Sequence, residues 1–294
     1  MSATALLQRS VRRITHKPRG RTHGMVTRLM SPGDLGQRLK PFVFLDLFDN
    51  GLFDNGLFDN GLFDNGGKPF TGFGLYPHSG IATLTYMAQG TVSYEDTNGA
   101  TGLLPEGGVE WMRAGKGVWH GGGAGEPGRA WGFQLWVALP PHLELGPSVS
   151  TYQAPADIPA IGPARVLLGT YSGVANAIEA PSPITYLAVK LRAGERWVYD
   201  QPSGHQVLWA AVGHGSVAAS GRIDAGELAI FEPGSASVEF NALEDAQLVL
   251  GSAVPHEHPL VLGHYSVHTS PAALLAGEVR IREIQADLQR DGRL

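Results

Sequence analysis

The sequence predicts an all-β protein made of two successive strand-rich modules and one C-terminal helix. Short apolar runs rich in Val, Thr, Trp and Tyr recur between residues 80 and 140, and runs of the same style recur between residues 184 and 240. Gly, Pro and Asn separate these runs, and none of them shows a sustained helical period. Closely spaced short strands with glycine-rich turns are typical of sandwiches and small barrels, whose interiors can hold one ligand.

Length and composition place the boundaries of the two modules. A chain of 294 residues with 43% hydrophobic content can form two domains of ordinary size. Residues 155–166 carry three prolines and little periodicity, which is typical of a linker or of irregular edge strands. We therefore expect an N-terminal domain over residues 1–150, which carries a basic N-terminal segment and an expanded loop over residues 48–67, and a C-terminal domain over residues 151–294.

The C-terminal helix is predicted to start directly after Ser270. Ser270 supplies a capping hydroxyl, Pro271 suits the first helical position, and the run AALLAGEVRIREIQADLQRD follows.

Charge and cysteine content exclude several classes of protein. The absence of Cys excludes disulfides and thiolate metal sites, so any metal must bind His, Asp, Glu or Tyr. Residues 1–40 hold nine Lys or Arg and one acidic residue, a net charge of +8. The whole chain has a net charge of −5, so residues 41–294 carry −13. Nucleic acid is therefore not an expected partner. We expect the basic arm to be a strand or tail with solvated charges. No run is apolar enough for an export signal or a membrane span, which predicts a cytoplasmic protein without a membrane partner.

A five-residue unit, Gly-Leu-Phe-Asp-Asn, repeats within residues 48–67. This period matches neither helix nor strand, and each Asn-Gly favours a tight turn. The repeated aspartates are candidate calcium ligands, but calcium loops place ligands at alternate residues and end in Glu, or use a nine-residue repeat. We expect a surface loop lengthened by tandem duplication instead. The repeated aspartates are Asp49, Asp54, Asp59 and Asp64. The Leu-Phe pairs that such a loop would expose are Leu52 and Phe53, Leu57 and Phe58, and Leu62 and Phe63.

Several segments resemble the pirin family. They are KPFVFLDLF (40–48), the strand beginning YPHSGIATLTY (76–86), VEWMRAGKGVWH (109–120), GFQLWVALP (132–140) and EHPLVLGHYSVHTS (257–270). The family pattern has His-Pro-His-Arg-Gly-Phe-Glu in the second segment and Gln-Trp-Met-x-Ala-Gly-x-Gly, ending at His-Ser-Glu, in the third. The resemblance implies two tandem cupin barrels, of double-stranded β-helix or jelly-roll type, with one metal pocket in the N-terminal barrel.

The resemblance also implies a metal set of three His and one Glu that holds Fe(II) or another first-row divalent metal. Position by position, the three His fall on Tyr76, His78 and His120, and the Glu falls on Gly122. Only two imidazoles remain, whereas metal sites normally have at least three protein ligands, so we expect metal binding to be weak or absent. A third ligand could come from Tyr76 as a phenolate or from Glu126 in the glycine-rich loop.

Three functional classes follow from the resemblance, and the sequence leaves open whether the chain is an enzyme. The first is a small-molecule or partner-binding pirin with a degenerate metal pocket. The second is an iron-dependent dioxygenase of the quercetinase type, acting on a small aromatic ligand in a pocket lined by Phe73, Trp111, Trp119 and Phe133. The third is a transcriptional or metabolic regulator that binds a protein partner.

The remaining histidines of note receive no role in chemistry. His256 and His258 flank Glu257, and we expect them to be solvated loop residues. His205 and His214 lie in the second module without a carboxylate at motif spacing.

Overall fold

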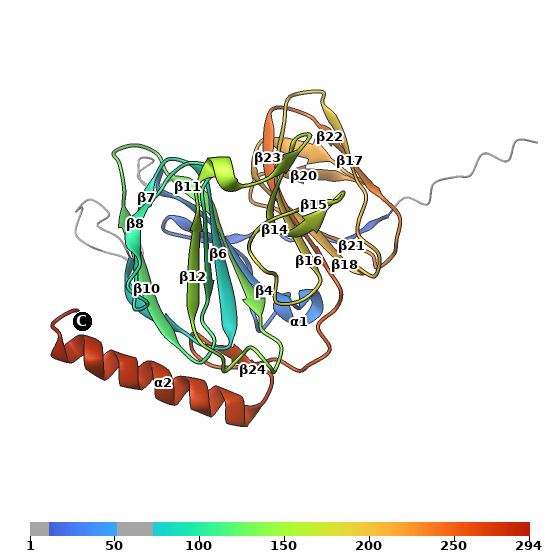
Figure 1. Cartoon of the computed structure of the whole chain (residues 1–294). Helices are drawn as coiled ribbons and strands as arrows, with labels where there is room; N and C mark the ends of the chain where they lie inside the picture. The colour runs from blue at the N-terminus through green and yellow to red at the C-terminus, as the bar shows by residue number, and fades with distance from the viewer. Residues whose placement is uncertain (1–11, 52–72) are drawn as a thin grey trace, which may run out of the picture.

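The computed structural model describes residues 12–51 and 73–294 and shows two β-barrels side by side (Figure 1). The predicted all-β architecture with a C-terminal helix is confirmed. Most of the pentapeptide repeat, from Leu52 onward, lies outside the described residues.

The first barrel consists of a seven-stranded and a four-stranded antiparallel sheet. In spatial order the larger sheet contains β12 (Val149–Gln153), β9 (Val109–Arg113), β6 (Ile81–Gln89), β11 (Trp131–Ala138), β4 (Phe42–Asp49), β3 (Val26–Met30) and β2 (Arg21–His23). The smaller sheet contains β5 (Phe73–His78), β10 (Val118–Ala124), β7 (Val92–Asp96) and β8 (Thr101–Leu104).

The second barrel repeats this two-sheet plan. Its larger sheet runs β1 (Ile14–His16), β21 (Leu228–Phe231), β18 (Val207–His214), β23 (Ala246–Ala253), β16 (Ile184–Leu191), β14 (Ala164–Tyr171) and β13 (Ala160–Ile161), with β15 (Val174–Ala175) paired to β14. Its smaller sheet runs β17 (Arg196–Tyr199), β22 (Val238–Ala242), β19 (Ser216–Ala218) and β20 (Arg222–Asp224). The other elements are α1 (Gly36–Leu39), a 3-10 turn (Pro155–Asp157), the pair β24 (Val261–Leu262) and β25 (Val267–His268), and α2 (Pro271–Arg290).

Strand alternation gives the seven-stranded sheet two buried faces. One face packs against the second barrel and forms a continuous apolar core that includes Trp111, Phe133 and Trp209. The Phe42 ring meets the Trp209 ring edge-on across this interface, with centroids 5.3 Å apart. Because successive side chains in a strand point to opposite faces, the neighbours Glu110 and Gln134 point into the first barrel.

The chain changes barrels at two places, which refines the predicted boundary. β12 pairs with β9 in the first barrel and β13 belongs to the second, so the change falls after Gln153 rather than at residue 150. β1 pairs with β21, so the N-terminal strand belongs to the second barrel rather than to the N-terminal domain. Arg12, expected to be solvated, is buried and donates to the Gln206 carbonyl at 2.8 Å.

Helix α2 returns from the second barrel to lie along the first, as Figure 1 shows in red. The predicted cap is confirmed, since Ser270 Oγ accepts from the Ala273 N–H at 3.2 Å. The inner face of α2 packs on Trp119, whose Nε1 donates to the Ile281 carbonyl at 2.9 Å. None of the helices described is both long and apolar enough to cross a membrane.

The tight contact between the barrels predicts that Gly213→Ala destabilises the protein. A Cβ at Gly213 would lie 2.6 Å from Trp131 Cζ3 and 2.8 Å from Phe133 Cζ, across the barrel interface. Overpacking of this kind costs about 1–3 kcal/mol. We expect urea unfolding to show that loss, whereas Gly234→Ala, at an exposed site with nothing within 4 Å, serves as the control. Equal stability of the two variants would contradict a close-packed interface.

Candidate functional site

Two buried histidines face each other inside the first barrel. His78 lies at the end of β5 and is 0% exposed, and His120 lies on the neighbouring strand β10 and is 2% exposed. Their ring centroids are 5.1 Å apart. Among the described residues neither Nε2 atom has a hydrogen-bond partner. Buried polar atoms are normally paired, so two unpaired nitrogens on adjacent rings indicate a place for a ligand.

The other ring nitrogen of His78 is held by the C-terminal segment. His78 Nδ1 lies 3.0 Å from the carbonyl oxygen of Tyr265. A carbonyl only accepts, so Nδ1 is the donor and Nε2 carries a lone pair. Burial, with a smaller contribution from His120, lowers the pKa of His78 to about 3, while the Tyr265 carbonyl acts in the opposite direction. His78 is therefore a neutral imidazole with an available acceptor.

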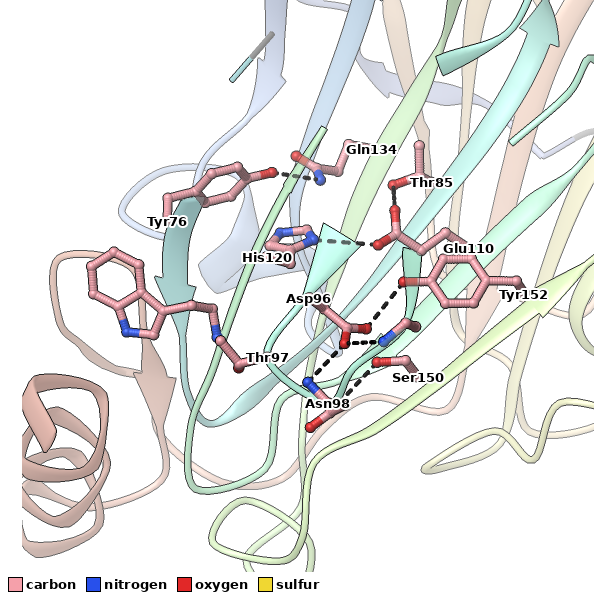
Figure 2. A network of polar contacts seen from close by, with 12 residues as sticks. Tyr76, Thr85, Asp96, Thr97, Asn98, Glu110, His120, Gln134, Ser150 and Tyr152 are labelled. Carbon is pink, nitrogen blue, oxygen red and sulfur yellow. Dashed lines mark hydrogen bonds and ion pairs between the residues drawn. The ribbon is translucent and has the colours of Figure 1, made fainter. Parts of the chain in front are cut away.

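His120 is held in the same way by a carboxylate. Its Nδ1 lies 3.3 Å from Glu110 Oε1, and Glu110 Oε2 accepts from Thr85 Oγ1 at 2.9 Å (Figure 2). Glu110 is 6% exposed. An imidazole whose second nitrogen bonds to a carboxylate or carbonyl is the usual arrangement of a metal-binding histidine. Both rings thus meet one requirement of a metal site.

Tyr76 completes the group but is poorly suited to act as an anionic ligand. Its ring centroid is 4.5 Å from that of His120, and its hydroxyl accepts from Gln134 Nε2 at 3.3 Å (Figure 2). Burial is the main cause that raises the pKa of Tyr76 above its ordinary value. The hydroxyl is therefore a neutral group bonded to Gln134, and the Tyr76 ring packs against both imidazoles.

A row of polar side chains crosses the inner face of the seven-stranded sheet beneath this group. Direct strand pairing joins one residue from each of six neighbouring strands, in the order Tyr152, Glu110, Thr85, Gln134, Asp46 and Arg28. Arg28 Nη2 donates to Asp46 Oδ2 at 3.0 Å. Burial raises the pKa of Asp46 to about 6 against the effect of Arg28. The row gives the first barrel a hydrogen-bonding floor alongside smaller apolar clusters, such as Phe44 with Trp136.

The segment that holds His78 is itself fixed by a buried hydrogen-bond chain. Ser79 Oγ donates to Ser266 Oγ at 2.8 Å and lies 3.0 Å from His268 Nε2. His268 Nδ1 lies 3.1 Å from Glu144 Oε2, which also accepts from the Thr269 N–H at 2.7 Å. The start of α2 is thereby tied to the strand end that carries His78.

The structure brings His78, His120 and Tyr76 together but does not add the other predicted ligand. Glu126 is exposed in the turn after β10. Across residues 12–51 and 73–294, no group of three or more His, Asp or Glu side chains is arranged to hold a metal ion. Gly122 contributes no side chain at the position where the resemblance implies a Glu.

The structure places three of the four predicted aromatic pocket residues elsewhere. Trp111 and Phe133 lie on the outer face of the sheet, in the core between the barrels. Trp119 packs under α2. Phe73 begins β5, but its side chain lies outside the described residues. The tryptophan ring found against His78 is instead that of Trp136, with centroids 4.7 Å apart.

Sequence reasoning missed Glu110, Gln134 and Tyr265. A charged residue inside the apolar strand VEWM, where the family pattern has Gln, was the available signal for Glu110. The Tyr265 carbonyl is a main-chain group that no side-chain pattern marks.

Of the two loop histidines predicted to be solvated, His256 is buried and His258 is not. His256 is 8% exposed rather than solvated, and burial is the main cause that lowers its pKa to about 4. His258 is exposed. His205 is buried in the second barrel, where its Nδ1 lies 2.7 Å from Ser252 Oγ.

Comparison with known proteins places this chain in a family. The Pirin family model matches residues 23–137. A protein of Caulobacter vibrioides named as pirin-like is 31% identical over 245 residues, covering 80% of this chain and 83% of the relative. The chain belongs to the pirin family.

Solved structures support the pirin fold over nearly the whole chain. A crystal structure titled quercetin 2,3-dioxygenase, from Acinetobacter baumannii, is 26% identical, has a TM-score of 0.79 and covers 97% of this chain and 99% of its own. A bacterial pirin from Escherichia coli, solved in complex with nickel(II), is 18% identical with a TM-score of 0.60, covering 83% and 98% of the two chains. The prediction of two cupin barrels is confirmed.

The buried neutral histidines predict that this pirin loses stability in mild acid. Burial lowers the pKa values of His78, His256, His205 and His268 in the folded state. The unfolded chain takes up protons near pH 6.5 while the folded chain does not, so the free energy of unfolding falls as pH falls below about 6.5. Asp46 acts in the opposite direction between about pH 4 and 6, but it is one group against four.

Urea unfolding at pH 7.5 and pH 5.0 measures this effect. We expect a lower unfolding free energy at pH 5.0 and a smaller difference in His256→Gln, which removes one such group away from the candidate site. Equal stability of the wild-type protein at both pH values would show that the buried histidines do not govern its acid response.

Proposed function

We propose that this chain is a small-molecule-binding pirin whose first barrel holds a divalent first-row metal weakly through His78 and His120. The observation that supports this function is the pair of buried Nε2 atoms, both without partners among the described residues, on rings 5.1 Å apart. Imidazole suits divalent first-row metals such as iron, cobalt, nickel and zinc, and metal–nitrogen bonds of about 2.0–2.1 Å allow two such rings to reach one ion.

Weak binding follows from the number of protein ligands. Tyr76 is neutral and hydrogen-bonded, and Gly122 offers no carboxylate, so two imidazoles must hold the ion with small-molecule ligands in the remaining positions. When bound, a divalent metal would act as a Lewis acid toward an oxygen of the ligand. The chain's own residues orient the two imidazoles, and burial keeps His78 neutral.

A small hydroxylated aromatic compound fits the surroundings of this pair. The Trp136 and Tyr76 rings pack against His78, with centroids 4.7 and 5.2 Å away, and supply flat apolar surface. The Tyr76 hydroxyl and the Gln134 amide supply neutral hydrogen-bonding groups. Ligand pockets commonly combine aromatic walls with a few such polar groups.

The second candidate function is a quercetinase-type dioxygenase. The near full-length similarity to the Acinetobacter baumannii protein titled quercetin 2,3-dioxygenase favours it. The replacement of two of the four implied metal ligands, at Tyr76 and Gly122, argues against it. A protein-binding regulatory role has no specific observation in its favour.

Titration of the metal-free protein with cobalt(II) tests the proposed function. We expect one site, seen by calorimetry and by the visible absorption of bound cobalt, that is weakened at least about ten-fold in His78→Ala and in His120→Ala because each removes a ligand. The exposed His258→Ala is the matched control and should bind as the wild type does.

Binding that is unchanged in both pocket variants, or absent from the wild type, would contradict the metal site. Quercetin turnover by the iron-loaded protein is expected at background level. Turnover that is lost in His78→Ala would make the dioxygenase the better assignment.

A further inference from the structure

We propose that Glu110 is a positioning residue for His120 and supplies the pocket with the negative charge that Gly122 does not provide. The part of this inference that concerns metal affinity rests on the proposed function. Glu110 is 6% exposed and comes from β9, on the sheet that faces the histidines. Its two carboxylate oxygens contact Thr85 Oγ1 and His120 Nδ1.

Among the described residues, Glu110 forms an ion pair with His120 and with no Lys or Arg. Arg28 is the cation of the same polar row, but it is paired with Asp46. Asp46 lies on β4, two strands along the sheet from β6, which carries Thr85, the neighbour of Glu110. A buried carboxylate without a counter-ion is costly, so the site gains free energy when a cation binds at the far nitrogen of His120.

Glu110 also decides which nitrogen of His120 is available. A carboxylate only accepts hydrogen bonds, so in the neutral imidazole it holds the proton on Nδ1 and leaves a lone pair on Nε2. That Nε2 atom is buried, without a partner among the described residues, on the ring next to His78. The carboxylate therefore prepares His120 as an acceptor before any ligand arrives.

Glu110 gives the pocket a carboxylate from another position, although Gly122 stands where the family resemblance implies a Glu. Residues two apart in a strand point to the same face, so a side chain at 122 would lie on the same side of β10 as His120. A Cβ there would meet the Ser93 carbonyl oxygen at 3.0 Å, which is tight. Glu110 reaches His120 from the opposite sheet and touches Nδ1, so it acts through the imidazole and not on the ion itself.

The tautomer of His120 in the metal-free protein tests the positioning role directly. Long-range proton–nitrogen NMR of the imidazoles should show the Nδ1–H form of His120 in the wild type. In Glu110→Leu the ring loses its acceptor, and we expect the Nε2–H form to appear. An Nε2–H form in the wild type, or a Glu110→Leu spectrum with His120 unchanged, would overturn the proposal.

Cobalt(II) affinity tests the role of the charge. Glu110→Gln keeps the shape and an oxygen acceptor but removes the charge, and we expect binding about 10–100-fold weaker with little change in the melting temperature of the metal-free protein. Glu106→Gln, which neutralises an exposed carboxylate 3.7 Å from Lys190, is the matched control. Affinity within two-fold of wild type in Glu110→Gln would refute the charge role.

Failure of the proposed metal site and failure of the positioning role of Glu110 can be told apart. If the wild type binds no cobalt(II) at His78 and His120, the proposed function fails, while the tautomer measurement still decides whether Glu110 positions His120.

Discussion

The seven-stranded sheet of the first barrel packs on the second barrel with one face and lines the interior of its own barrel with the other. The alternation of side chains along each strand is the constraint on which both faces depend. Odd and even side chains of the same strands face opposite ways, so Trp111 and Phe133 pack on the second barrel while Glu110 and Gln134 face the first barrel's interior. A shift of one residue in register would exchange these sets. The apolar contact between the barrels therefore fixes which side chains of this sheet, including Glu110 and Gln134, face the site.

A polar floor inside a barrel is stable only when its members are paired. Thr85 donates to Glu110, Gln134 donates to Tyr76, and Arg28 pairs with Asp46, so most of the row is satisfied. Among the described residues, the unpaired buried atoms of this region include Thr83 Oγ1, Trp136 Nε1 and the Nε2 atoms of the two histidines. Each histidine Nε2 is left free because the partner of its ring, a carbonyl or a carboxylate, engages the other nitrogen. A barrel selected only for stability has no need of that arrangement.

The sequence was sufficient for the fold class and the cap of α2, because strand composition, family motifs and local capping carry that information. It also named His78 and His120, whose ring centroids lie 5.1 Å apart. It was insufficient where the answer depended on contacts between distant segments. Aromatic character predicts that Trp111 and Phe133 line the pocket, but it does not show which face of a sheet a residue occupies. Both residues lie on the face opposite the pocket. The N-terminal strand and the Tyr265 carbonyl reach their partners from the other end of the chain, and only the tertiary structure shows these contacts.

The most direct measurement of the central claim is an anomalous difference map at the cobalt edge from crystals exposed to cobalt(II). The account predicts one strong peak from a cobalt ion that is bonded to the Nε2 atoms of both His78 and His120, at about 2.1 Å from each. A map without density between these two rings, or with the metal bound at His256 and His258 instead, would contradict it.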